Sequence, residues 1–148
     1  MNLKKIIIVG IITEVAAFIV GCLLYMNPMT SSIYASVSAS GAYCAKSMEL
    51  FGGTVNWLGF MLLGGLVYSI LMTLLYSFAE KGLPLTPSWK KGLAFGFLFW
   101  LAAGVPNSYN TWLLHSYPVS IIGLETFNGL IGALVAGLVI GTAYEKIN

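Results

Sequence analysis

Long runs of apolar residues, separated by short polar stretches, dominate the chain. Four of these runs are long enough to cross the hydrocarbon core of a bilayer, which takes about 20 helical residues. We predict membrane-spanning helices over residues 3–26, 54–78, 90–114 and 119–144. The runs do not alternate apolar and polar positions as the strands of a membrane barrel do. The prediction is therefore an all-α integral membrane protein, a four-helix bundle in a single domain over residues 1–148.

The connections between these helices differ greatly in length. Residues 27–53 are expected to form a long loop on the outer side, whereas residues 116–118 allow only a tight turn. The long loop carries a serine-rich stretch, residues 31–41, that has no charged side chain. A partner docked there would be recognised by shape and hydrogen bonding.

Composition and charge fix the expected orientation. Of the 148 residues 58% are hydrophobic and 8% are charged, against about 25% charged in soluble proteins. The chain has seven lysines and no arginine, and all but Lys46 lie on the side that holds both termini, namely Lys4, Lys5, Lys81, Lys90, Lys91 and Lys146. This positive-inside pattern predicts a multi-pass plasma (inner) membrane protein with both termini cytoplasmic. The net charge of +2 is too small to suggest a nucleic-acid partner.

The amino terminus permits a second interpretation. Two lysines, an apolar run and then Ile19-Val20-Gly21-Cys22 resemble a bacterial lipoprotein signal with its lipidated cysteine. Glu14 would interrupt the apolar part of such a signal, so we favour a plain first helix. A genuine signal would leave three crossings and a lipid anchor.

A faint internal repeat relates the two halves of the chain. At one constant offset Lys4, Lys5, Gly10, Ala16 and Ala17 recur as Lys90, Lys91, Gly96, Ala102 and Ala103. We interpret the four helices as two like-oriented hairpins, as in a parallel repeat whose axis follows the membrane normal.

Small residues mark the faces on which these helices are expected to pack, because close approach in lipid depends on side chains without bulk. The candidates are Gly10 and Gly96, and on the fourth helix one face with Gly129 and Gly132 and a second with Gly137 and Gly141. Two such faces on one helix imply two neighbours. Either one face binds another subunit, or the helix is central in its own bundle.

Glu14 is the first polar residue of interest, because it lies about 12 Å into the hydrocarbon core, eight residues after Ile6 at a rise of about 1.5 Å per residue. An ionised carboxylate near the middle of a membrane costs several kcal/mol. The sequence places no lysine at that depth, so we expect Glu14 to be protonated unless it meets water or a cation. A hydrogen bond to Ser69, at a similar depth on the second helix, is the structural alternative to a functional role.

A second polar group is expected in the outer half, where Asn107, Glu125 and Asn128 project inward with Asn110 above them. Pro106 removes a backbone hydrogen bond, which predicts a kink and an exposed carbonyl beside Asn107. These groups would form either a small polar binding cavity or a water-filled packing defect. Glu14 and this group together are the candidate binding residues.

The two cysteines form neither a Cys-x-x-Cys motif nor a metal-ligand spacing, so we expect no metal site. Cys22 and Cys44 both fall on the outer side, where they form a disulfide or remain free thiols. A soft Cu(I) site would draw on these cysteines and on the outer residues Met26, Met29, Met48 and His115. Methionines in apolar segments usually serve packing, which disfavours it.

Catalysis is disfavoured by missing residues. A quinone-linked thiol oxidoreductase needs Cys-x-x-Cys, a bis-histidine haem needs two histidines, and the chain has one. We expect no cofactor. The favoured function is a non-catalytic subunit that packs through its glycine faces into a homo-oligomer or a larger membrane complex. The alternative is a small oligomeric transporter or channel that uses Glu14, Asn107, Glu125 and Asn128.

Overall fold

Helices make up almost all of the chain that the computed structural model describes, residues 2–39 and 51–147, and that part contains no strand. The prediction of an all-helical chain is confirmed for these residues. In chain order the elements are α1 (Leu3–Tyr25), α2 (Pro28–Ala39), α3 (Thr54–Ala79), the 3₁₀ turn η2 (Glu80–Gly82), α4 (Ser88–Phe99), the π turn η3 (Trp100–Gly104), α5 (Val105–Leu114) and α6 (Val119–Lys146).

Three helices are long and apolar enough to cross a membrane. They are α1, the run Val55–Gly82 formed by α3 and η2, and α6. They coincide with three of the four predicted crossings to within a few residues. The remaining segment, residues 90–114, is helical throughout and belongs to a continuous rod of α4, η3 and α5. The π turn η3 interrupts the α-helical geometry of this rod, so that neither α4 nor α5 is long enough to span a membrane on its own. Its crossing therefore stays a prediction.

The π turn explains how the rod accommodates Pro106. Proline has no N–H group and its ring clashes with the preceding turn. The helix responds by widening just before it, so that the Val105 N–H donates to the Trp100 carbonyl oxygen, five residues back. The Ser108 hydroxyl donates to the Gly104 carbonyl oxygen at 3.0 Å. The interruption expected at Pro106 thus takes the form of a π bulge, a recognised cause of local helix distortion.

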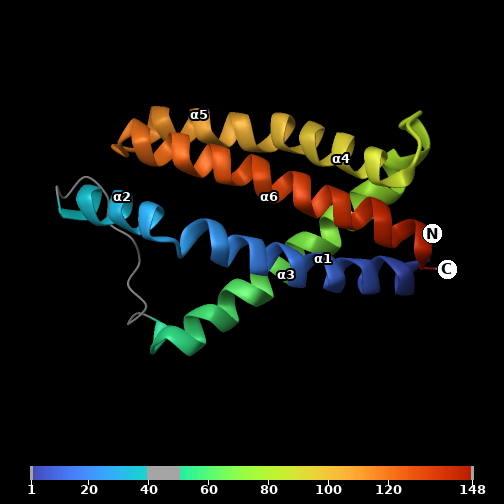
Figure 1. Ribbon diagram of the computed structural model, residues 1–148, viewed down its shortest axis with the longest axis horizontal. Helices are drawn as coiled ribbons and strands as arrows, with labels where there is room; N and C mark the ends of the chain where they lie inside the picture. Colours follow the sequence, from blue (N-terminus) through green and yellow to red (C-terminus); the bar gives the residue numbers. More distant parts are fainter. Residues whose placement is uncertain (1, 40–50, 148) are drawn as a thin grey trace.

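α6 is the central element of the fold. α4 packs along it, and α1 packs against both α6 and α3 (Figure 1). Figure 1 places the start of α1 and the end of α6 at the same end of the molecule, and the Lys5 ammonium lies 4.2 Å from the centre of the Tyr144 ring. α3 crosses α1 obliquely, and its first half stands away from α6 (Figure 1).

The contact between α4 and α6 depends on glycines from both helices. A Cβ atom on Gly92 would meet the carbonyl oxygen of Gly137, and one on Gly96 would meet that of Ala133. A Cβ atom on Gly141 would lie 2.5 Å from the Ser88 carbonyl oxygen. One of the two small-residue faces predicted on α6 is therefore closed against α4 within the chain, where the backbones touch.

The other predicted packing glycines differ among themselves. Gly10 meets α3, since a Cβ atom there would lie 2.7 Å from Cγ1 of Ile70. A Cβ atom on Gly129 would lie 4.0 Å from the Trp100 ring, and a Cβ atom on Gly132 would have no other atom within 4 Å. The second small-residue face of α6 is thus incompletely filled.

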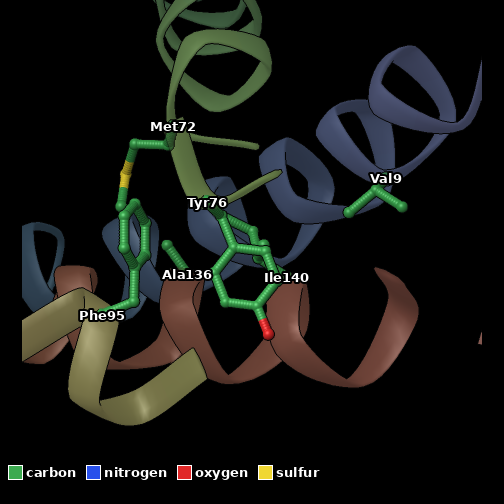
Figure 2. Close-up of a cluster of buried hydrophobic side chains, with 6 residues drawn as sticks. All are labelled: Val9, Met72, Tyr76, Phe95, Ala136 and Ile140. Atoms are coloured by element: carbon green, nitrogen blue, oxygen red, sulfur yellow. The ribbon is translucent and has the colours of Figure 1, made fainter. Parts of the chain in front are cut away.

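Side chains from four helices form the apolar core. Figure 2 shows a cluster made of Val9 from α1, Met72 and Tyr76 from α3, Phe95 from α4, and Ala136 and Ile140 from α6. Tyr76 meets Phe95 edge to face, with ring centres 5.3 Å apart. The cluster fixes the second half of α3 against α4 and α6.

The segment predicted as a long loop contains α2, which is a difference from the sequence prediction. Asn27 caps this helix, because its side-chain oxygen accepts from the Thr30 N–H at 2.9 Å. Pro28 occupies the first helical position, which proline favours. The Thr30 hydroxyl donates to the Leu24 carbonyl oxygen at 2.9 Å and ties α2 to the end of α1. The serine-rich composition favours a loop, and in the prediction it outweighed the helix start signal of Asn27 and Pro28.

Candidate functional site

A cavity of about 810 Å³ lies between α1, α3 and α6, and α2 contributes to its wall. Its volume is within the roughly 300–1,000 Å³ range of small-molecule sites. Most of its lining is apolar or aromatic, and the polar residues in its wall include Glu14, Ser69 and Asn128.

The cavity exists because α3 diverges from α6 and because several lining positions have no side chain. Gly21 on α1 and Gly132 on α6 have no atom within 4 Å of where a Cβ atom would be. Gly65 on α3 and Gly129 on α6 complete the set of lining glycines. The space is a product of the oblique crossing seen in Figure 1 and of this sequence pattern.

Glu14 is held in the wall of this cavity by α3. Its side chain is 8% exposed, and the Ser69 hydroxyl donates to its Oε2 at 3.0 Å. Ser69 is itself fixed by its helix, where the Thr73 hydroxyl donates to the Ser69 carbonyl oxygen at 2.8 Å. Gly65 lies directly against the carboxyl group, which occupies the space that a Cβ atom would need. The hydrogen bond to Ser69 considered from the sequence is present.

Asn128 brings a hydrogen-bond donor to the same cavity from α6. It is 5% exposed, and its Nδ2 has no hydrogen-bond partner among the described residues. A buried donor without a partner costs about 1–3 kcal/mol. An unpaired buried donor is unusual in a native protein, and this one belongs to a residue that lines the same cavity as Glu14.

Replacing Asn128 by leucine is therefore expected to stabilise the protein. The substitution removes the unpaired donor and keeps a side chain of similar size, which should raise the free energy of unfolding by about 1–3 kcal/mol. Thermal unfolding of the detergent-solubilised protein measures this as a higher midpoint. The exposed Asn107, changed to leucine, is the control and should leave the midpoint unchanged. A lower midpoint for Asn128→Leu would mean that ordered water already pairs this amide.

A second, smaller cavity of about 150 Å³ lies between η3, α5 and the first half of α6. It is lined by Trp100, Gly104, Asn107, Ser108, Thr111, Ile122, Glu125, Thr126 and Gly129. The Trp100 indole N–H donates to the Thr126 carbonyl oxygen at 3.1 Å, and the Thr126 hydroxyl donates to the Ser108 hydroxyl at 2.7 Å. On α2, the Tyr34 hydroxyl donates to Oε1 of Glu125 at 3.0 Å. Hydrogen bonds within the chain thus already satisfy many of the polar groups in the wall of this cavity.

The structure divides the polar residues that the sequence grouped together. Asn107 and Glu125 line the smaller cavity, whereas Asn128 lines the larger one with Glu14. Asn110 is exposed and lines neither. Sequence reasoning found Glu14 and Asn128 but placed them in separate groups.

Two further residues of the site were missed. Tyr34 was counted only as part of a loop, although it lines the larger cavity and donates to Glu125. Gly65 was passed over among many glycines, although it makes room for the Glu14 carboxyl group. The only sequence signal for Gly65 is its position four residues before Ser69, which places both on one helix face.

The disulfide that the sequence allows between Cys22 and Cys44, with free thiols as its alternative, involves a residue outside the described ranges, as does a Cu(I) site that includes Met48. Cys22 is half-buried and lines the larger cavity. Within residues 2–39 and 51–147 no group of three or more histidine, cysteine and acidic side chains is placed to hold a metal ion.

The larger cavity is the better candidate site. It offers an apolar volume, a buried carboxyl group and a buried amide donor. In the smaller cavity, by contrast, many polar groups of the wall are already hydrogen-bonded to other residues of the chain. An apolar cavity with a few polar groups in its wall is the arrangement that small-molecule binding sites have. Comparisons of the chain with protein-family models, with curated proteins and with solved structures found no match, so the function is inferred from these residues.

Proposed function

We propose that the protein is a small membrane transporter that binds an amphipathic solute in the cavity between α1, α3 and α6. The observation that carries the proposal is that two buried polar residues, Glu14 and Asn128, both line one largely apolar cavity. Buried ionisable groups inside membrane proteins are costly and usually serve a substrate or ion pathway. The apolar wall receives the body of the solute, and the polar groups orient it.

The proposed setting is the inner membrane, crossed four times. Three helices have the required length and apolar character, and the rod of α4, η3 and α5 runs beside α6 as the fourth crossing. Large apolar side chains on α3 point outward, with Leu63 63% and Val67 60% exposed. Such a surface suits lipid contact. The lysine pattern puts both termini in the cytoplasm.

A non-catalytic subunit is the second candidate, and the outward face of α3 is the observation that favours it. Phe60, Leu63, Val67 and Leu71 are all exposed on this helix. Of the glycines that the sequence offered for subunit contact, Gly96, Gly137 and Gly141 are already packed between α4 and α6, and Gly129 and Gly132 line the larger cavity. A homo-oligomer or larger complex would therefore use α3, by a packing of apolar side chains that does not depend on Glu14.

The transporter proposal predicts binding that is lost when the cavity is filled. The probes are tetraphenylphosphonium, tetraphenylborate and triphenylphosphine oxide, which differ in charge and share aromatic bulk. We expect at least one to bind the wild-type protein in lipid nanodiscs, measured by equilibrium dialysis, and to enter proteoliposomes faster than it enters protein-free liposomes. Gly132→Phe should reduce that binding at least about tenfold, because its ring would occupy the empty space beside Gly132.

Gly123→Phe is the matched control, since Gly123 is on the same helix, exposed, free of neighbours within 4 Å and outside the cavity wall. It should bind as the wild-type protein does. Binding of no probe above that of empty nanodiscs would overturn the transporter proposal. Unchanged binding by Gly132→Phe would overturn the assignment of the cavity. Either result would leave the subunit candidate.

A further inference from the structure

The larger cavity carries one possible charge and no counter-charge of its own. Glu14 is the only acidic residue among the described lining residues, and these include no lysine, arginine or histidine. An ionised Glu14 would thus be a buried carboxylate without a cationic partner from the cavity wall, an arrangement that costs several kcal/mol. A ligand that supplies a positive charge removes that cost.

Aromatic rings surround the same space. The lining aromatic residues are Phe18 and Tyr25 from α1, Tyr34 from α2, and Trp57 and Tyr68 from α3. The face of an aromatic ring attracts a cation, by about 2 kcal/mol or more where water is excluded. An apolar cavity with aromatic walls and one carboxyl group favours a cation whose charge is spread over an apolar body.

Resting on the function proposed above, we propose that the solute is a lipophilic monovalent cation and that it binds in exchange for the proton of Glu14. In the empty cavity the carboxyl group is protonated. When the cation enters, the Glu14 O–H bond breaks, the proton leaves to bulk water, and the carboxylate pairs with the cation. One positive charge enters and one leaves, so the net charge of the site does not change.

The hydrogen bonds at Glu14 fit this exchange. The Ser69 hydroxyl donates to Oε2, and donation to a carboxylate is stronger than donation to a neutral acid. Asn128 adds its unpaired N–H group to the wall of the same cavity. The Ser69 donor supports the ionised form once a cation balances its charge.

A neutral solute with an acceptor oxygen is the competing ligand class. It would accept from Asn128 and from a protonated Glu14, and no proton would leave. The two classes differ in the sign of their pH dependence. Raising the pH removes the proton that competes with a cation, so cation affinity rises, whereas affinity for the neutral acceptor falls as Glu14 loses its donor.

Other titratable groups facing the cavity do not produce this dependence. They are Cys22 and Tyr25 on α1, Tyr34 on α2 and Tyr68 on α3, and the described lining residues of α6 include none. Thiols and phenols ordinarily titrate at about pH 8.5 and 10. We therefore assign the pH dependence of cation binding to Glu14.

The test is tetraphenylphosphonium binding to the full-length protein in nanodiscs at pH 5.5, 6.5 and 7.5. We expect the affinity to rise by up to about tenfold per pH unit. Calorimetry in buffers of different ionisation enthalpy should find close to one proton released per cation. Tetraphenylborate and triphenylphosphine oxide should bind more weakly at every pH.

Glu14→Gln should lower the affinity at least tenfold and abolish both the pH dependence and the proton release. Glu14→Asp keeps an acid, so it should retain proton release, and Glu145→Gln, at an exposed position outside the cavity, should behave as wild type. If triphenylphosphine oxide binds best and its affinity falls with pH, the cation inference is wrong and the transporter proposal stands. If no probe binds at any pH, both fail.

Discussion

Changing Gly65 to alanine is expected to weaken tetraphenylphosphonium binding roughly 10- to 100-fold without unfolding the protein. The Glu14 carboxyl group lies where the new methyl group would be, so it must turn away from α3 and lose the hydrogen bond from Ser69. A hydrogen bond to a charged group contributes about 1.5–3 kcal/mol, which corresponds to that loss of affinity. Equilibrium dialysis at pH 7.5 measures it.

The neighbouring Gly64 gives a control of the same chemical change. It is on the same helix and exposed, and no atom lies within 4 Å of its missing Cβ atom. Gly64→Ala should bind the cation as the wild-type protein does, and both variants should keep their helical circular dichroism. Full affinity in Gly65→Ala would mean that the position of Glu14 against α3 does not matter for binding.

Changing Gly137 to alanine is expected to destabilise the fold by about 1–3 kcal/mol, because the added methyl group would press on the backbone of α4. The Gly92 carbonyl oxygen and the Gly96 Cα atom occupy its place, and neither can rotate away as a flexible side chain can. The two helices must separate, and they lose contact along their length. Thermal or denaturant unfolding in detergent measures the loss.

The same substitution elsewhere on α6 should have the opposite sign. Gly123 is exposed and meets no atom within 4 Å, so Gly123→Ala gains only the better helix propensity of alanine, about 1 kcal/mol at most. A Gly137→Ala variant as stable as Gly123→Ala would show that α4 and α6 do not depend on close backbone contact.

The helices were predictable because each one is determined by a local run of apolar residues. The length of each apolar run is visible in the sequence, and it gave α1, α3 and α6 to within a few residues. Depth along a helix is equally local. Counting residues from the helix ends placed Glu14 and Ser69 at the same level, and they are hydrogen-bonded.

The cavity was not predictable, because it depends on how α3 crosses α1. Periodicity says which residues share a helix face, but it does not say which neighbour that face meets. Asn128 and Glu125 are three residues apart, and the sequence therefore assigned them to one site. In the structure Asn128 lines the larger cavity, whereas Glu125 lines the smaller one and accepts a hydrogen bond from Tyr34 of α2.

The π turn at Trp100–Gly104 has a consequence for how this chain tolerates insertions and deletions. Each residue of an α-helix turns the chain by about 100°. The wide turn holds one residue more than an α-helical turn, so a residue added or removed there changes the width of the turn and leaves the facing of α5 largely as it was. A one-residue insertion or deletion within α4 would instead rotate every later side chain of the rod by about 100°. The wall of the smaller cavity that Asn107 and Ser108 form is therefore less sensitive to a one-residue change within residues 100–104 than to the same change in α4.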